Sequence, residues 1–266
     1  MAENEVSMAL LPAPTCLTFG CEAAQMWVGS TSRKTDMAYS DDPDYRPTIG
    51  ILLYPGYTLL DLAGPQIAIG NQGNTLLFWK DMNPVRGDNG PELVPTTTFA
   101  EYDGNIDVLL VPGGFGVEDA MSDPEIIGFL QRAAKTARVV SAACTGTLLL
   151  AAAGLLDGRK ATTHWFAYEA IERNFPKIEL VRNARVVTDG NVFTSGGVTA
   201  GIELGIRLLA EAKGDRVAAT TELAMCYDPE PPFGTGSPSK AGPDLLKAAI
   251  KYAQKIGTEK LWLAAA

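Results

Sequence analysis

Short apolar runs alternate with segments of helical periodicity along most of the chain. From Thr48 onward the apolar runs are rich in β-branched side chains and are bounded by glycine, proline or polar residues, which is typical of buried strands. The pattern predicts strands at residues 48–54, 76–80, 108–114, 137–144 and 192–197. It predicts helices at residues 61–70, 123–137, 145–156, 164–174 and 199–214.

Continuous apolar strands that alternate with helices indicate a mainly parallel sheet with helices on both faces. The expected fold is therefore a doubly wound, flavodoxin-like α/β layer. Ligand sites in such sheets lie outside the carboxyl ends of the strands, where strand-to-helix turns converge. Four turns carry unusual chemistry, and we expect them to meet at one edge of the sheet: residues 54–65, 111–116, 141–147 and 194–201.

The two ends of the chain differ from this pattern. Residues 1–46 show no sustained period and close on a polar, acidic stretch, so we interpret them as an N-terminal extension that forms a surface arm or is partly ordered. Residues 47–266 are expected to form one α/β domain. Within it, the proline- and glycine-rich residues 228–243 predict a long surface loop, and residues 245–263 predict a helix packed on the body or on a second subunit.

Composition narrows the range of partners. With 266 residues and 46% hydrophobic content the chain can bury a sizeable core. Its net charge of -9 argues against binding to nucleic acid or to an anionic membrane surface, since both require clustered Lys and Arg. No secretory signal is recognised at the N-terminus, and no apolar stretch reaches the length of a membrane span. We therefore expect no nucleic-acid or membrane partner, and the candidate site described below is expected to take a small-molecule substrate.

The four cysteines, Cys16, Cys21, Cys144 and Cys226, are scattered through a chain too long to need disulfides, which fits a reducing cytoplasm. Cys16 and Cys21 have the spacing of half a metal site. We reject that reading because the chain has one histidine and no second pair of cysteines. No metal and no cofactor are therefore expected.

Cys144 is the strongest candidate for chemistry. It follows an apolar strand and precedes a long helix expected from Thr145, with Ala142, Ala143 and Gly146 as small neighbours. This is the pattern of a nucleophile on a tight strand-to-helix turn. The positive end of the helix is expected to lower the pKa of the thiol, which predicts a reactive thiolate. The alternative is a buried structural cysteine.

Three further turn residues could complete a site. Gly113 and Gly114 end another strand, where the N–H of Gly114 together with that of Thr145 could hold developing negative charge; an ordinary tight turn is the alternative. Asp61 lies just beyond the first strand. It is either the N-cap of the following helix or, in an apolar cleft beside Cys144, an acid or base with a raised pKa.

His164 is the only histidine and lies about twenty residues beyond Cys144. A Cys/His pair is a common activation device, but the intervening helix must fold back before the two side chains can meet. We therefore expect His164 to line the pocket together with Gly113 and Gly197. Direct catalysis and a structural role remain alternatives for this residue.

With these residues identified, the chain from about Thr48 resembles the DJ-1/PfpI superfamily, in the branch of the isonitrile hydratases, whose fold is related to class I glutamine amidotransferases. Parts of it also resemble the sensor domains of amidase-like transcription regulators. The resemblance rests on LDLAGP, LFWKDMNPVRGDNG, TTFAEYDGNIDVLLVPGG, SAACTGTLLLAAAGLLDGRKATTHW, GGVTAGIELGIRLLAE and YDPEPPFGTGSP.

The resemblance implies a cofactor-free lyase and a homodimer. Cys144 matches the family nucleophile, Asp61 the acidic residue and Thr145 the residue after the cysteine. The implied reaction is hydration of an isonitrile to an N-substituted formamide through a covalent thioimidate. Two alternatives stay open. A related cysteine enzyme could act on an α-oxoaldehyde, an amide or a biosynthetic intermediate, and a non-catalytic thiol sensor or ligand-binding protein could carry the same motif.

Overall fold

A seven-stranded sheet forms the centre of the domain in the computed structural model, which describes residue 42 and residues 44–255. The strand order is β10-β11-β7-β6-β1-β2-β5, and every pair is parallel except the β10–β11 hairpin. The strands of this sheet are β1 (Thr48–Leu52), β2 (Asn74–Trp79), β5 (Thr97–Thr98), β6 (Val108–Val111), β7 (Val139–Ala142), β10 (Val186–Asp189) and β11 (Val192–Ser195).

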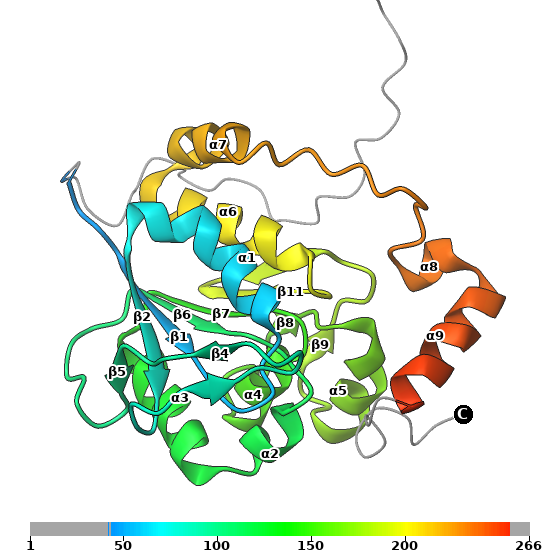
Figure 1. Ribbon diagram of the computed structural model, residues 1–266, viewed down its shortest axis with the longest axis horizontal. Helices are drawn as coiled ribbons and strands as arrows, with labels where there is room; N and C mark the ends of the chain where they lie inside the picture. The colour runs from blue at the N-terminus through cyan, green and yellow to red at the C-terminus, as the bar shows by residue number, and fades with distance from the viewer. Residues whose placement is uncertain (1–41, 43, 256–266) are drawn as a thin grey trace, which may run out of the picture. The chain divides into compact units, whose positions relative to one another are not determined.

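Helices cover both faces of the sheet, which confirms the doubly wound fold. In Figure 1, α1 and α6 lie together on one face, with α7 against α6, while α2, α3 and α4 pack on the other. The helices are α1 (Leu59–Ile69), α2 (Val117–Met121), α3 (Pro124–Thr136), α4 (Gly146–Ala152), α5 (Tyr168–Asn174), α6 (Ala200–Lys213), α7 (Asp215–Ala224), α8 (Pro238–Ala241) and α9 (Pro243–Lys255). The described residues also form two 3-10 turns, η1 (Gly70–Gln72) and η2 (Trp165–Ala167). Two small two-stranded sheets complete the described secondary structure: β3 (Val85–Arg86) pairs with β4 (Glu92–Leu93), and β8 (Lys160–Ala161) pairs with β9 (Glu179–Leu180).

The five predicted strands correspond to β1, β2, β6, β7 and β11, whereas β5 and β10 at the edges of the sheet were not predicted. All residues of β6 and β7 are buried, as continuous apolar runs require in a sheet covered on both sides. α1 and α6 approach each other closely, because a Cβ on Gly205 would lie 2.5 Å from the carbonyl oxygen of Pro65. The helix expected at 145–156 is shorter than predicted: α4 ends at Ala152, and Gly154 then adopts a φ of 73°.

The topology places a switch point between β1 and β6. β1 is followed by β2 on one side, and the chain returns to β6 on the other. The chain therefore leaves the carboxyl ends of β1 and β6 in opposite directions, which opens a crevice between the two turns. Ligands usually bind in this crevice in such sheets. None of the described helices is both long and apolar enough to cross a membrane.

All described residues belong to one compact unit. The interpretation of residues 1–46 as an extension falls almost entirely outside the described residues, as do Cys16 and Cys21, so these expectations stay predictions. The C-terminal helix is present as α9, while residues 256–263 of the predicted segment lie outside the described part of the chain.

Candidate active site

Cys144 occupies a strained turn between β7 and α4. Its φ is 54°, in the left-handed region that residues with a Cβ rarely adopt. The amide N–H of Cys144 donates to the carbonyl oxygens of Ser195 at 3.1 Å and Gly196 at 3.0 Å, and its own carbonyl accepts from Thr163 Oγ1 at 2.8 Å. The predicted elbow is thus present, and hydrogen bonds from two neighbouring turns hold its conformation.

The small residue after the elbow is required by close contact. A Cβ on Gly146 would lie 2.2 Å from the carbonyl oxygen of Val111, at the end of the adjacent strand β6. The chain can therefore turn sharply from Cys144 into α4 only with glycine at this position. The residue Cys144 is 5% exposed, so it lies in a buried site.

Asp61 faces Cys144 from the first turn of α1. The Asp61 carboxyl is fully buried, its Oδ2 accepts from the Gly113 N–H at 3.1 Å, and the Cys144 thiol hydrogen-bonds to the same carboxyl. Its Oδ1 is buried and has no hydrogen-bond partner among the described residues. The N-cap alternative is wrong, because the N-cap of α1 is Thr58. Asp61 therefore offers a free acceptor oxygen beside the sulfur.

Burial sets the protonation of this pair. It raises the pKa of Asp61 from 3.8 to about 7, an effect that the charge of Asp88 increases and that hydrogen bonds from Cys144 and Gly113 only partly oppose. Burial and the negative charge of Asp61 raise the pKa of the Cys144 thiol well above its usual value. The prediction of a thiolate is therefore wrong: the helix N-terminus and nearby N–H groups do not outweigh desolvation and a neighbouring carboxylate.

The backbone donors at the site differ from the predicted pair. The Gly114 N–H donates to Thr145 Oγ1 at 2.9 Å, so it is engaged rather than free to hold negative charge. The N–H groups that hydrogen-bond to the Cys144 sulfur are those of Thr145 and Val198. Sequence reasoning missed Val198, although it lies in the fourth turn that was expected at this edge of the sheet.

The Gly113 position is too crowded for any side chain. A Cβ there would lie 2.6 Å from both the amide nitrogen and Oγ1 of Thr145 and 2.8 Å from Asp61 Oδ2. The backbone of the β6 turn thus contacts the acid and the residue after the nucleophile at once. The Tyr57–Gly114 bridge and this contact bring together the turns at residues 54–65, 111–116 and 141–147. The hydrogen bonds from the Cys144 N–H to Ser195 and Gly196 add the fourth predicted turn, at residues 194–201.

His164 packs against the turn that carries Val198. Its ring packs against Gly197, where a Cβ would lie 2.8 Å from His164 Cδ2, and its Nδ1 accepts from the Phe166 N–H at 3.2 Å. Burial lowers its pKa from 6.5 to about 4, so the imidazole is neutral. Within residues 44–255, the interactions of His164 do not join it to Cys144 or Asp61. Its position supports a place in the wall of the site rather than a role as base.

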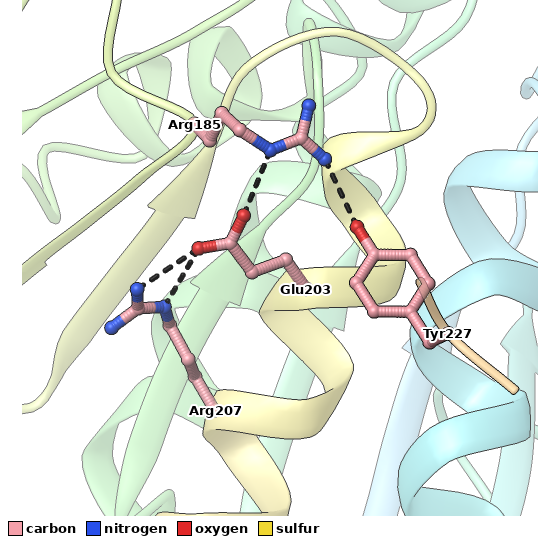
Figure 2. Close-up of polar contacts among 4 residues, drawn as sticks. All are labelled: Arg185, Glu203, Arg207 and Tyr227. Carbon is pink, nitrogen blue, oxygen red and sulfur yellow. Dashed lines mark hydrogen bonds and ion pairs between the residues drawn. The ribbon is translucent and has the colours of Figure 1, made fainter. Parts of the chain in front are cut away.

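A hollow of about 400 Å³ lies on the outer side of α1. Residues 225–229 form one wall, and Leu60, Ala63, Gly64, Ile67 and Ile202 form the other. Figure 2 shows the contacts that hold residues 225–229 in place. Arg185 donates to Tyr227 at 3.1 Å and to Glu203 at 2.8 Å, and Glu203 also accepts from Arg207. Exposed Cys226 lines this hollow, and neither Cys144 nor Asp61 is among its lining residues. In the described part of the chain, no three His, Cys, Asp or Glu side chains gather as metal ligands would.

Comparison with known proteins places this site in a family. Residues 48–211 match the DJ-1/PfpI family over more than half of the chain. The chain belongs to the DJ-1/PfpI family. An isonitrile hydratase from Pseudomonas putida is 42% identical over 216 residues, which cover 79% of this chain and 93% of that protein. The transcriptional regulator GbdR from Pseudomonas aeruginosa is 30% identical over 189 residues, 68% of this chain and 51% of the regulator.

Solved structures agree with the family assignment. A ThiJ/PfpI family protein from Pseudomonas syringae superposes with a TM-score of 0.76 and 36% identity, covering 84% of this chain and 94% of that one. DJ-1β from Drosophila melanogaster has a TM-score of 0.62 at 19% identity, which shows a shared fold alone. The predicted fold class and family branch are both confirmed by these relatives.

Proposed function

We propose that this DJ-1/PfpI protein hydrates an isonitrile, R–NC, to an N-substituted formamide. The observation that carries the proposal is the buried pair of Cys144 and Asp61, in which one thiol shares a hydrogen bond with a carboxyl of pKa about 7. Such a pair can supply a nucleophile and move a proton at neutral pH. The identity to an isonitrile hydratase over nearly the whole length of that protein supports the same reaction here.

The first step adds the thiol to the isonitrile carbon. The ionised Asp61 carboxyl takes the Cys144 S–H proton and passes it to the terminal carbon of R–NC while the sulfur bonds to that carbon. The product is a thioimidate, R–N=CH–S, and Asp61 is again a carboxylate. The N–H groups of Thr145 and Val198 support this step because they hydrogen-bond to the sulfur as its negative charge develops.

The second step adds water. Asp61, through its free Oδ1, removes a proton from a water molecule positioned with the help of Thr145, and the hydroxide adds to the thioimidate carbon. The proton passes to the nitrogen, giving R–NH–CH(OH)–S. Asp61 then moves the hydroxyl proton to the sulfur as the C–S bond breaks, which releases R–NH–CHO and restores the thiol. Covalent catalysis thus divides a difficult hydration into easier steps.

A substrate panel tests this proposal. Purified protein is incubated with alkyl and aryl isonitriles, and formamide is measured by chromatography and mass spectrometry against buffer alone. An α-oxoaldehyde and a primary amide are included as competing electrophiles. We expect formamide from at least one isonitrile. Turnover of the other electrophiles with no formamide would reassign the enzyme, and no turnover of any compound would favour a ligand-binding role.

The pH dependence of the reaction follows from Asp61. Only its ionised form can accept the thiol proton, so kcat/KM should rise about tenfold per pH unit on the acid side and level off above the Asp61 pKa of about 7. The measurement is kcat/KM for one isonitrile from about pH 5 to about pH 9. A profile that is flat through neutrality would contradict the proton role of Asp61.

Gly113→Ala should damage the site and the fold together. The added methyl overlaps Thr145 and Asp61, so we expect a loss of about 1 to 3 kcal/mol in the free energy of unfolding and a kcat at least about tenfold lower. Gly128→Ala in α3 is the matched control, because its Cβ would meet only the flexible end of Arg132 at 3.4 Å. The control should be as stable as the wild type or more so. Urea unfolding measures the stability of the two variants, and steady-state assays measure their kcat.

We further propose that the protein is a cytoplasmic homodimer. The family resemblance supports a dimer, and Leu60 and Ile67 on α1 are exposed apolar side chains of the kind that an interface covers. The scattered cysteines, of which Cys144 and Cys226 are free, support a reducing compartment. Light scattering should give twice the 28.2 kDa of one chain, and a mass of one chain would refute the dimer.

A further inference from the structure

The β3–β4 hairpin places the carboxylate of Asp88 beside the N-terminus of α1. Residues 87–91 connect its strands and lie against the loop that follows β1. The Gly56 N–H donates to the Arg86 carbonyl at 2.8 Å, and the Asp88 N–H donates to the Tyr57 carbonyl at 2.9 Å. Gly87 is also tightly placed, since a Cβ there would lie 3.0 Å from the same carbonyl oxygen. These contacts fix Asp88 beside the N-terminus of α1.

A continuous set of hydrogen bonds runs from Asp88 to Asp61. Thr58 Oγ1 donates to Asp88 Oδ2 at 2.5 Å, the Thr58 N–H donates to the Gly113 carbonyl at 2.8 Å, and the Gly113 N–H donates to Asp61 Oδ2 at 3.1 Å. Thr58 is the N-cap residue of α1, yet its side chain makes no capping hydrogen bond. Its hydroxyl hydrogen-bonds to Asp88 instead. Replacing this hydroxyl therefore removes the contact with Asp88 without removing a capping hydrogen bond of α1.

The charged and titratable groups around the two carboxyls come from three elements. Asp61 faces the Cys144 thiol, the Tyr54 phenol at the end of β1 and Asp88 on the hairpin. Asp88 faces Tyr54 and Tyr57, and its Oδ1 accepts from the Asn89 amide at 3.0 Å. Burial raises the pKa of both tyrosines, which are therefore neutral. Arg86 is on the same hairpin, with an exposed side chain.

We propose that Asp88 is a positioning residue for the hydration reaction: through Thr58 and Gly113 it fixes the Asp61 carboxyl against Cys144, and it faces that carboxyl with a second negative charge. This inference rests on the proposed function. The charge makes ionisation of Asp61 harder, in addition to the effect of burial, so the ionised Asp61 carboxyl is a stronger base toward the Cys144 thiol proton. The hydrogen bonds keep the donor and acceptor atoms aligned.

Two variants separate the two effects. Asp88→Asn keeps an acceptor oxygen for the Thr58 hydroxyl but removes the charge, so the midpoint of the acid limb should move to lower pH by about 0.5 to 1 unit. Thr58→Val keeps the Asp88 charge but removes the hydroxyl, so the plateau rate should fall about tenfold with the midpoint unchanged. Thr58→Ser restores the hydroxyl and should recover most of the rate.

The experiment uses two readouts on the full chain. One is kcat/KM for isonitrile hydration against pH. The other needs no substrate: the rate of Cys144 alkylation by iodoacetamide against pH, followed by the mass of the Cys144 peptide, because ionised Asp61 promotes alkylation by accepting the thiol proton. Asp103→Asn is the matched control, since Asp103 is an exposed carboxylate in the loop that precedes β6, at the opposite edge of the sheet.

The outcomes distinguish this inference from the proposed function. If the wild type hydrates no isonitrile, the proposed function fails, and alkylation still decides the role of Asp88. A shifted midpoint in Asp88→Asn but not in Asp103→Asn supports the charge effect, and a low plateau in Thr58→Val with recovery in Thr58→Ser supports positioning. Equal midpoints in wild type and Asp88→Asn, or equal plateaus in Thr58→Val and Thr58→Ser, would overturn the inference.

Discussion

Cys144→Ala should fold and hydrate isonitriles no faster than buffer does. The sulfur is the only atom that bonds to the isonitrile carbon in the proposed mechanism, and neither Asp61 nor Thr145 can replace it as a nucleophile at that position. The methyl group of alanine keeps the Cβ and the left-handed turn, so the backbone hydrogen bonds to Ser195, Gly196 and Thr163 can persist. Formamide production and thermal unfolding are the measurements.

The matched control for this change is Cys226→Ala. Cys226 is exposed in the hollow on the outer side of α1, and it too has a positive φ, of 51°. A Cys→Ala change there tests the loss of a thiol on a similar turn without touching the proposed chemistry, so turnover should match the wild type. If Cys144→Ala retained more than about 1% of wild-type kcat, the covalent mechanism would be wrong, because loss of a nucleophile costs far more than that.

Asp61→Asn should lower kcat by about 100-fold to 10,000-fold, the range expected for loss of general acid/base catalysis. Asparagine has nearly the same shape, and its Oδ1 can still accept from the Gly113 N–H, so the turn after β6 stays in place. What is lost is the group that receives the thiol proton and returns it to carbon. A variant with nearly full activity would end the proton-transfer role and make His164 the next residue to test.

The same variant should change how stability depends on pH. The folded-state pKa of Asp61, about 7, lies above the ordinary value of 3.8, so the folded protein binds the proton more tightly than the unfolded chain. The contribution of Asp61 to stability is therefore fully present below about pH 4 and is lost as pH rises to about 7. The loss is at most about 4 kcal/mol, since each pH unit between the two pKa values is worth about 1.4 kcal/mol.

The side chain introduced by Asp61→Asn does not titrate, so the stability of this variant relative to the wild type should improve across that interval. Urea unfolding of both proteins at about pH 5 and about pH 8 measures the difference. A constant difference between the two curves would mean that Asp61 has the same pKa in the folded and unfolded states. Such a result would remove the physical basis for proton transfer at neutral pH while leaving the placement of Cys144 untouched.

The hydrophobic pattern predicted the central strands because they are buried on both faces, and it missed β5 and β10 at the two edges of the sheet. β6 and β7 are continuous apolar runs, so periodicity and burial agree, and the turns that follow them had to meet at one edge. The short elements were missed for the opposite reason. The β3–β4 strands have two residues each and owe their position to contacts with the loop after β1, a long-range effect that a local pattern does not record.

The protonation of Cys144 shows where sequence reasoning about the site ended. The turn, its small neighbours and the start of the following helix were predicted correctly, and the helix N-terminus favours a low thiol pKa. The opposing effects depend on depth and on distance: the sulfur is buried, and the Asp61 carboxyl from another turn lies against it. Neither quantity can be obtained from residues 139–147 alone. The hydrogen bond from the Gly114 N–H to Thr145 Oγ1 could not be predicted for the same reason, because it joins two turns that are far apart in the sequence.

The most direct test of the central claim is the mass of the protein during turnover. Wild-type protein is mixed with excess isonitrile, quenched in acid at a series of times, and digested for peptide mass analysis. The account predicts a transient gain equal to the full mass of the isonitrile on the peptide that carries Cys144, because addition of S–H across the carbon loses no atoms. Steady formation of formamide with the added mass on Cys226, or on no cysteine at any quench time, would contradict it.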